Sequence, residues 1–406
     1  MPKTNDNIIK FLRENMRKTV RLPKDSGGLL NYPYTVPSTG DGFRNFFYWD
    51  TYFANWALYA MGMYEQAGNN LKNMAELINK FGYMPNADVL TNRSQPPLFI
   101  RGVYEYREQT GDAEFVRKML PAMRAEYDFW MRDRIAPCGL NRYGSSAKTE
   151  DEIISFNKEI AERLGLNLSE KEERDVQLLA SAESGWDFTS RFFDNGESCR
   201  SYDICPVDLN AILFDAELKL AQFEREFGSG AERMEAAAAK RKELMRKYMY
   251  DGKTYRDCYA DTGELRGENT HAGSFFAAAF GVDKNCGVKT LCNELMTKHG
   301  LLTCTENKYS KRFQWDYPMM WPPLAGIAEV SLRKAGEYDL AEELRVAFIR
   351  TVEKVFECTG NLWEKYNVVS CVVGHAAEYK TPPMLGWTAG VYLRFTEIQN
   401  KKGEKK

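Results

Sequence analysis

The residues of this chain best suited to chemistry are carboxylates that stand beside aromatic side chains. Asp187 follows a Gly-Trp pair, and Glu364 lies between Trp363 and Lys365. An Asp packed against indole and phenyl faces loses hydration, which raises its pKa and favours a protonated general acid. Lys365 would keep Glu364 charged if the two side chains face each other. The pair is therefore a candidate acid and base.

Both carboxylates also have a structural interpretation. Asp187 could cap a helix by accepting hydrogen bonds from the amides of Thr189 or Ser190, since Asp is favoured at N-caps. A glutamate such as Glu364 or Glu378 is more often a solvated surface residue than a catalyst. In either case the segment around Asp187 is expected to break or begin a helix, because Gly and Asp have poor helix propensity.

Other kinds of catalytic site lack support in the sequence. His271, His299 and His375 are far apart, and no His-x-x-x-His pair, Walker loop or Gly-x-Ser-x-Gly motif occurs. The nine cysteines are irregularly spaced without a Cys-x-x-Cys pair, which favours reduced thiols in a cytoplasmic protein over disulfides or a zinc site. The sequence predicts no metal and no cofactor, which favours carboxylate chemistry such as glycoside hydrolysis.

Three further stretches carry polar groups that could bind a sugar, and two of them also carry aromatic residues. Asp50 stands among six aromatic residues between Phe46 and Phe53, and Asn86 precedes a polar loop at 92–97. A later run, 314–318, places polar groups beside Trp315. Arg, Asn and Gln side chains supply the directed hydrogen bonds that sugar hydroxyls require. An aromatic core cluster and a structural turn are the alternatives for the first two.

The composition of the chain limits which partners and which domain organisation are expected. The 406 residues carry a formal charge of -2, which gives no reason to expect nucleic acid or an anionic membrane as partner. No apolar run is long enough to span a membrane, and Met1–Val20 lacks the apolar segment of a signal peptide. Without a linker or composition break, residues 1–406 are expected to form a single domain with a charge-rich insertion at about 148–174, as a lid or a solvated helical pair.

The elements that must position these residues are helices. Apolar residues recur at helical spacing along nearly the whole chain, and the joining segments carry the motifs. Asp208 is a candidate N-cap, and Val368–Val373 is the best strand-like run. Periodicity alone leaves a bundle, a solenoid or a helical barrel open. The expected helices are Asn7–Arg17, Thr51–Ala67, Leu71–Lys80, Pro97–Thr110, 115–130, Glu152–Leu164, 212–227, Glu232–Tyr250, His271–Phe280, Val288–Lys298, Pro323–Ala335, 340–355 and Gly386–Gln399.

Seven motifs occur in the order and at roughly the spacing of the α,α-trehalase family of glycoside hydrolases, which the chain resembles from Phe43 to Val391. They are Tyr48-Trp49-Asp50-x-Tyr52, Arg93-Ser94-Gln95-Pro96-Pro97, Ala182-Glu183-Ser184-Gly185-Trp186-Asp187, Pro206-Val207-Asp208-Leu209-Asn210, Gln314-Trp315-Asp316-x-Pro318, Glu364-Lys365-Tyr366 and Gly386-Trp387-Thr388.

The resemblance implies an all-α (α/α)6 barrel with an inverting mechanism, in which Asp187 is the general acid and Glu364 the general base. An inverting enzyme needs these carboxyl groups roughly 6.5–9.5 Å apart to admit a water molecule. The positions that the resemblance assigns to substrate binding are Phe43, Trp49, Asp50, Asn86, Arg93, Gln95, Gly185, Trp315 and Glu378.

The chain departs from the family pattern in its arginines. Gly42 stands where the family has an active-site Arg, Asn45 replaces a Glu, and the Arg-Pro-Glu-Ser-Tyr segment expected after Tyr143 is absent. Only Arg93 of three substrate-clamping arginines is clearly in place, and the glycine-rich lid before Glu378 is reduced to 374–377. Arg44, Arg142 or Lys148 are candidate replacements.

The expected protein is a cytoplasmic, cofactor-free inverting glycosidase that acts on a small saccharide, α,α-trehalose first, as a monomer or weak homo-oligomer. One alternative is a relative of the same barrel class that cleaves another α-glucoside or α-mannoside. The other is a catalytically silent barrel that binds a saccharide or a protein partner.

Overall fold

The computed structural model describes residues 4–40, 43–267, 269–309, 312–375, 379–383 and 386–403. Helices make up most of this part of the chain. The α-helices are α1 (Thr4–Asn15), α2 (Tyr48–Ala60), α3 (Tyr64–Phe81), α4 (Phe99–Thr110), α5 (Ala113–Asp133), α6 (Glu150–Leu164), α7 (Glu170–Glu173), α8 (Gln177–Glu183), α9 (Val207–Phe227), α10 (Ala231–Tyr248), α11 (Phe276–Ala279), α12 (Val288–Leu295), α13 (Pro322–Lys334), α14 (Tyr338–Thr359) and α15 (Gly386–Gly403).

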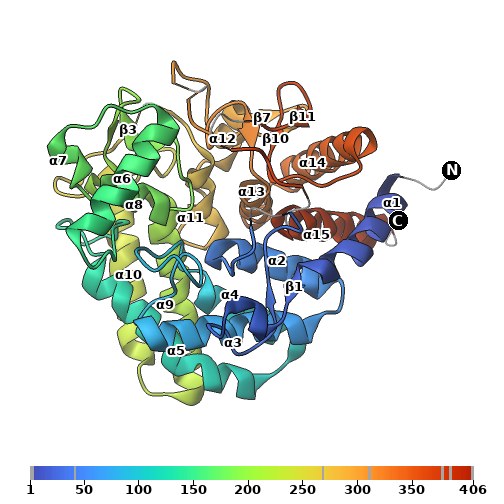
Figure 1. The fold of residues 1–406 in the computed structure, drawn as a ribbon, viewed down its shortest axis with the longest axis horizontal. Helices are drawn as coiled ribbons and strands as arrows, with labels where there is room; N and C mark the ends of the chain where they lie inside the picture. The colour runs from blue at the N-terminus through green and yellow to red at the C-terminus, as the bar shows by residue number, and fades with distance from the viewer. Residues whose placement is uncertain are drawn as a thin grey trace.

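Twelve of the helices in the described part of the chain form two concentric rings (Figure 1). In the inner ring α2, α4, α9, α11, α13 and α15 each contact the next helix, and α15 closes the ring against α2. Helices α1, α3, α5, α10, α12 and α14 alternate with them along the chain and lie outside (Figure 1). This is the (α/α)6 barrel that the sequence predicts.

The distribution of apolar residues explains which helices lie inside. The inner helix α2 has apolar and aromatic residues on every side and is buried from Tyr48 to Leu58, as expected of a helix surrounded by protein. The outer helix α10 buries only one stripe, which includes Met234, Ala238 and Met245 at helical spacing. Its remaining surface is charged and faces water.

The strands of the described residues are two residues long and tie loops together. They are β1 (Val20–Arg21), β2 (Tyr34–Thr35), β3 (Phe193–Asp194), β4 (Ser198–Cys199), β5 (Ile204–Cys205), β6 (Cys258–Tyr259), β7 (Met296–Thr297), β8 (Gly300–Leu301), β9 (Met319–Met320), β10 (Tyr366–Asn367) and β11 (Val372–Val373). In the three-stranded sheet β11-β10-β9, Tyr366 lies opposite Met320. This pairing brings the motif at 314–318 beside Glu364.

Several predicted elements differ from the structure at their boundaries; the helix expected over Val288–Lys298, for example, ends at Leu295 before β7. Two others are divided by a turn. The helix expected over Thr51–Ala67 is divided into α2 and α3, because Gly62 adopts a φ of 69° that reverses the chain. The strand expected at Val368–Val373 is a hairpin instead, with β10 and β11 joined by a turn in which Cys371 has a φ of 58°. The alternating apolar pattern there spans a turn rather than one strand.

Asp208 is not the N-cap of α9. Pro206 holds that position, and the Asp208 carboxylate accepts a hydrogen bond of 2.7 Å from Nη2 of Arg191. Arg191 also donates from Nε to Asp257 over 2.7 Å. The carboxylate is thus used in a buried ion pair beneath the loop that carries Asp187, which local sequence could not indicate.

The charge-rich insertion folds as helices α6 and α7. Thr149 caps α6, and the buried Asn157 donates to the carbonyl groups of Glu172, Glu173 and Asp175. The insertion is therefore a packed helical pair. Whether it closes over the site stays a prediction.

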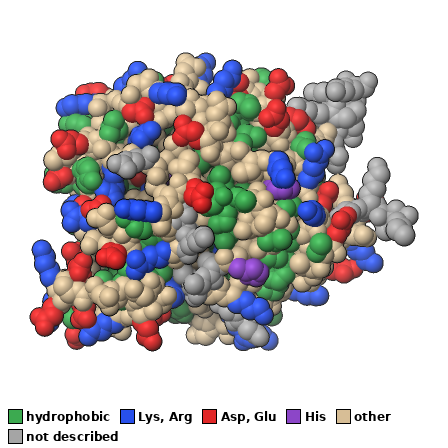
Figure 2. Space-filling view, turned by 90° about the horizontal axis from the view of Figure 1, so that it is seen from above, with side chains coloured by type: hydrophobic (Ala, Val, Ile, Leu, Met, Phe, Trp, Pro, Cys, Tyr) green, Lys and Arg blue, Asp and Glu red, His purple; other side chains and the backbone are tan. Residues whose placement is uncertain are grey.

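The surface carries charges of both signs. Figure 2 shows one face on which basic and acidic side chains are interspersed. In the described ranges, no helix combines the length and the apolar character needed to cross a membrane.

Candidate active site

Asp187 lies just beyond a helix end. Helix α8 ends at Glu183, and Gly185 has a φ of 73°, in the left-handed region that favours glycine. A Cβ atom at Gly185 would also lie 3.4 Å from Cδ of Pro96 and 3.6 Å from the indole of Trp49. The turn thus lies against two other predicted binding segments, and its backbone conformation is the reason that glycine is favoured there.

The alternative reading of Asp187 as a helix cap is wrong. Thr189 caps the short 3-10 helix at Ser190–Phe192 by accepting from the Arg191 amide over 3.2 Å, while Asp316 accepts hydrogen bonds from Oγ1 of Thr189 over 2.7 Å and from the amide of Ser190 over 3.0 Å. Burial raises the pKa of Asp316 to about 6. The Asp187 side chain is thereby left for another purpose, and its loop is held by a carboxylate from a distant motif.

Glu364 is held by donors on both oxygens. Nζ of Lys365 lies 2.5 Å from Oε2, and the hydroxyl group of Tyr379 donates to Oε1 over 2.6 Å. The indole of Trp387 donates to the Glu364 carbonyl over 3.0 Å. The side chains of Lys365 and Glu364 face each other, which is the condition under which Lys365 was expected to favour the charged carboxylate.

Gln314 joins the two carboxylate segments. Its Nε2 donates to the Asp187 carbonyl over 3.0 Å, and its Oε1 accepts from Nζ of Lys365 over 3.0 Å. A continuous path of hydrogen bonds therefore runs from the Asp187 backbone through Gln314 and Lys365 to the Glu364 carboxylate. Gln314 belongs to one of the seven sequence motifs, but its function could not be predicted from the sequence.

Asp50, Asp187 and Glu364 lie within electrostatic reach of one another. Burial raises the pKa of Asp50 to about 8, with further contributions from the charges of Glu364 and Asp187. Burial also raises the pKa of Asp187, in the direction that the sequence predicts, while Arg163 and then Arg93 lower it. The site thus holds carboxyl groups that keep their protons above the usual range of pH.

Trp49 and Trp315 belong to an indole cluster behind the carboxylates. Trp315 stacks on Trp321 at 3.7 Å between ring centroids and on Trp186 at 5.6 Å. Trp49 lies 6.2 Å from Trp315. Since Trp49 is only 1% exposed and Trp315 only 3%, both rings support the site from within the core.

The loops at 86–97 attach to the beginning of α2. Oε1 of Gln95 accepts a hydrogen bond from the Trp49 amide over 3.0 Å, and the carbonyl of Asn86 accepts one from the Tyr48 amide over 3.0 Å. These acceptors satisfy amide groups at the helix start that have no partner within the helix. Gln95 and Asn86 therefore position the segment that carries Asp50.

Arg93 faces the acid side of the site. Its guanidinium lies 5.0 Å from the ring centroid of Phe156, on α6, and the Asp187 charge raises its pKa against the larger lowering effect of burial. Its buried Nε has no hydrogen-bond partner among the described residues. This N–H group is a donor suited to a ligand oxygen.

Glu183, to which the sequence assigned no function, anchors the part of the site that contains Asp187. One carboxylate oxygen accepts from the Ser94 amide over 2.8 Å and the other from the Gly144 amide over 2.6 Å. Arg134 donates to both oxygens over 2.7 and 2.8 Å. Glu183 is fully buried, so it holds three chain segments in fixed relation to the loop of Asp187.

Asp187 opens into a cavity of about 710 Å³ between α6 and the loop at 89–93. Residues of α6 at helical spacing line it on one side, so the insertion is a wall of the candidate site. They are Glu152, Ser155, Phe156, Glu159, Ile160 and Arg163. A larger cavity of about 910 Å³ lies elsewhere, between α2, α4 and α15, and contains neither catalytic candidate.

Arg163 is the arginine that the sequence analysis did not identify. It lines the cavity of Asp187, its guanidinium lies 5.5 Å from the ring of Phe188, and its side chain is exposed. Spacing along α6 could have indicated the lining face, but not that Arg163 lies within electrostatic reach of Asp187.

The three candidate replacements for the missing arginines do not line the cavity that contains Asp187. Arg142 donates to the carbonyl and the hydroxyl group of Tyr202 and lies over that ring. Arg44 and Lys148 are exposed, and neither lines this cavity. Contact of Arg44, Arg142 or Lys148 with the substrate stays a prediction.

Of the remaining positions named from the sequence, one lies at the site and the others lie outside the residues that the structure describes. The ring of Phe43 lies 6.1 Å from that of Tyr379, the residue that donates to Glu364. Glu378 and Gly42 lie outside the described residues.

Comparison with known proteins adds an independent line of argument. A family model described as Trehalase matches residues 3–400 of this chain. The periplasmic trehalase of Pseudomonas aeruginosa is 31% identical over 407 residues, which cover 91% of this chain and 71% of that protein. A probable trehalase of Oryza sativa subsp. japonica is 29% identical, with coverage of 96% and 76%.

Solved structures share the fold. The neutral trehalase of Saccharomyces cerevisiae superimposes with a TM-score of 0.76 at 23% identity, covering 90% of this chain and 73% of that chain. The GH63 mannosylglycerate hydrolase of Thermus thermophilus superimposes with a TM-score of 0.66 at 15% identity, covering 93% and 100%. At these identities the likeness establishes the barrel.

Proposed function

The chain belongs to the trehalase family of glycoside hydrolases, and from this premise we propose that it cleaves α,α-trehalose with Asp187 as general acid and Glu364 as general base. The observation that carries the proposal is the path from Asp187 through Gln314 and Lys365 to Glu364. It connects two carboxylate segments from distant parts of the chain through the Asp187 backbone, and so leaves the Asp187 side chain for the substrate.

The proposed reaction is a single displacement. Asp187 transfers its proton to the interglycosidic oxygen, while Glu364 takes a proton from a water molecule whose oxygen attacks the anomeric carbon from the opposite face. The bond between that carbon and the glycosidic oxygen breaks, so the two products are two glucose molecules. Each oxygen of Glu364 has a second lone pair, so the bonds from Lys365 and Tyr379 are compatible with contact to water.

Asp50 has a supporting role in this proposal. With a pKa of about 8 it is mostly protonated at pH 7, so it can donate a hydrogen bond to a sugar hydroxyl group beside Glu364. A neutral Asp50 also avoids placing another negative charge beside the base.

The direct test of the reaction is the anomeric composition of the first products. Inversion at one anomeric carbon of α,α-trehalose yields one β-glucose, and the other glucose leaves with its α configuration. Proton NMR during the first minutes is expected to show the two anomers in equal amounts. Only α-glucose would contradict inversion. Release from another α-linked disaccharide but not from trehalose would contradict the proposed substrate.

We predict that Arg163→Met raises the KM for trehalose by about tenfold, because a charged donor to the substrate is lost. The positive charge of Arg163 lowers the pKa of Asp187, so its removal raises that pKa. A general acid acts when protonated and loses activity as pH rises through its pKa. The alkaline limb of the profile of kcat/KM against pH is therefore expected to move to higher pH.

Arg174→Met is the matched control for this prediction. Arg174 is an exposed arginine of the same insertion that pairs with Glu150 and does not line the cavity. Its replacement is expected to leave both KM and the pH profile unchanged. An alkaline limb of Arg163→Met at the wild-type position would refute the proposed effect of the Arg163 charge on the acid.

A further inference from the structure

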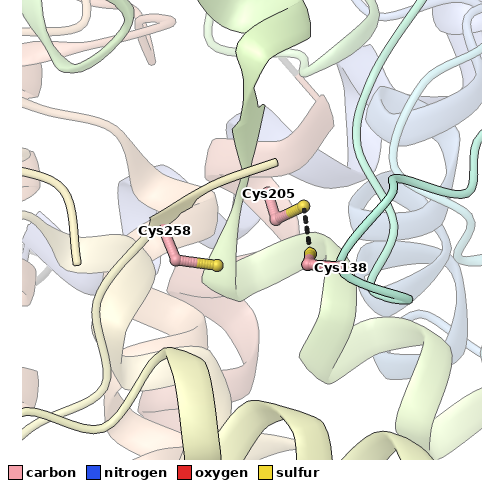
Figure 3. Close-up of side chains that lie close together, drawn as sticks. All are labelled: Cys138, Cys205 and Cys258. Atoms are coloured by element: carbon pink, nitrogen blue, oxygen red, sulfur yellow. Dashed lines mark hydrogen bonds between the residues drawn. The ribbon is translucent and has the colours of Figure 1, made fainter. Parts of the chain in front are cut away.

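Three cysteines from distant parts of the chain converge at one point. The sulfur atoms of Cys138, Cys205 and Cys258 lie within 4.8 Å of one another, and those of Cys138 and Cys205 are 3.7 Å apart (Figure 3). All three are free thiols. A disulfide bond would need sulfur atoms about 2.05 Å apart, so the arrangement is that of separate ligand atoms.

Backbone hydrogen bonds fix the positions of these cysteines. In the antiparallel pair of β5 and β6, Cys205 lies directly opposite Cys258. The loop that follows α5 is attached to the same region, because the amide of Cys138 donates to the carbonyl of Ala260 over 3.1 Å. The three sulfur atoms are thus brought together by backbone pairing of the folded protein, before any ligand is considered.

The spacing agrees with coordination of one ion. With metal–sulfur bonds of about 2.3 Å, three sulfur atoms around one ion stand roughly 3.8–4.0 Å apart in tetrahedral or trigonal geometry. The sulfur atoms of Cys138 and Cys205, 3.7 Å apart, are already close to this spacing, and no pair of the three is more than 4.8 Å apart. Cys205 and Cys258 are buried and Cys138 is half-buried, so an ion would be shielded on two sides and reached past Cys138.

We propose that Cys138, Cys205 and Cys258 form a trithiolate site for a soft d10 metal cation, Cu(I) or Zn(II). Thiolates are the preferred ligands of such ions. Binding releases the thiol protons to solvent as three metal–sulfur bonds form. Cu(I) is satisfied by three sulfur atoms, whereas Zn(II) takes a water molecule as its fourth ligand on the open side of Cys138.

The site would join three elements of the barrel. Cys138 belongs to the loop after α5, Cys205 precedes α9, and Cys258 follows Asp257, which pairs with Arg191. None of these thiols touches Asp187 or Glu364 in the described contacts, so the ion has a structural role.

The test is metal binding to the reduced full-length protein. Cu(I) buffered by bicinchoninate and Zn(II) buffered by a chromophoric chelator are titrated separately. We expect one ion per chain, a sulfur-to-metal charge-transfer band for Cu(I), and an affinity at least 100-fold higher for wild type than for Cys138→Ser. X-ray absorption is expected to show three sulfur atoms for Cu(I), and three with one oxygen for Zn(II).

Cys292→Ser, another buried cysteine far from the cluster in sequence, is the matched control and is expected to bind like wild type. Cys138→Ser is the main variant because its side chain is half-buried, and its unchanged hydrolytic activity reports correct folding. Equal affinity of wild type and Cys138→Ser for both ions, or sulfur coordination below three for both, would overturn the proposal.

Discussion

Asp187→Asn is expected to lower kcat on trehalose by about 10²- to 10⁴-fold, the contribution usual for a positioned general acid. The amide keeps the size of the side chain but has no proton to give the leaving oxygen. Burial raises the pKa of Asp187 over the opposing effects of Arg163 and Arg93, so the wild-type residue retains a proton at pH values where an ordinary Asp is ionised. Steady-state kinetics at several pH values measures the effect.

A substrate with a different leaving group separates the two catalytic roles. Fluoride leaves without full protonation, so α-glucosyl fluoride is expected to be hydrolysed by Asp187→Asn with much less loss than trehalose. Glu364→Gln removes the base and is expected to lose activity on both substrates. Asp151→Asn is the control, because Asp151 lines the same cavity on α6 yet lies outside the proposed mechanism. Equal losses on both substrates for Asp187→Asn would contradict its assignment as the acid.

Glu183→Ala is expected to reduce the free energy of unfolding by about 3–5 kcal/mol. The replacement leaves the Arg134 guanidinium buried without its partner, and it removes the acceptor of the Ser94 and Gly144 amides. An uncompensated buried charge costs more than the loss of the same pair at the surface. Urea denaturation measures the change through the midpoint and the slope.

Two variants make this prediction specific. Glu150→Ala removes an exposed partner of Arg174 and is expected to leave the midpoint nearly unchanged. Adding Arg134→Met to Glu183→Ala is expected to restore part of the lost stability, because the unpaired charge disappears. If Glu183→Ala unfolds at the same urea concentration as Glu150→Ala, Glu183 is not the anchor described.

Much of the barrel could be predicted from the periodicity of apolar residues and from the order of the motifs. Helical spacing indicated most of the ring helices, since apolar residues recur on the faces that pack. The errors occurred where a single residue changes the backbone direction. Gly62 divides the helix expected over Thr51–Ala67, and the turn before Val372 divides the strand expected at Val368–Val373.

The functional residues divide in a similar way. Asp187 and Glu364 could be proposed from sequence because local aromatic neighbours and motif order single them out. Arg163 could not, because its approach to Asp187 depends on how α6 packs. The roles of Gln314 and Glu183 could not be predicted either, because they consist of hydrogen bonds to segments far along the chain.

By itself the sequence determined the helical class, the motif positions and the two candidate carboxylates, because these depend on short-range spacing. Only the tertiary structure decided that Asp316 accepts from the Ser190 amide considered as a partner of Asp187, that Lys365 and Tyr379 hold Glu364, and that three cysteines meet. The physical reason is that hydrogen bonds and ion pairs act over a few ångströms. Chain folding, not sequence separation, sets which groups come within that range.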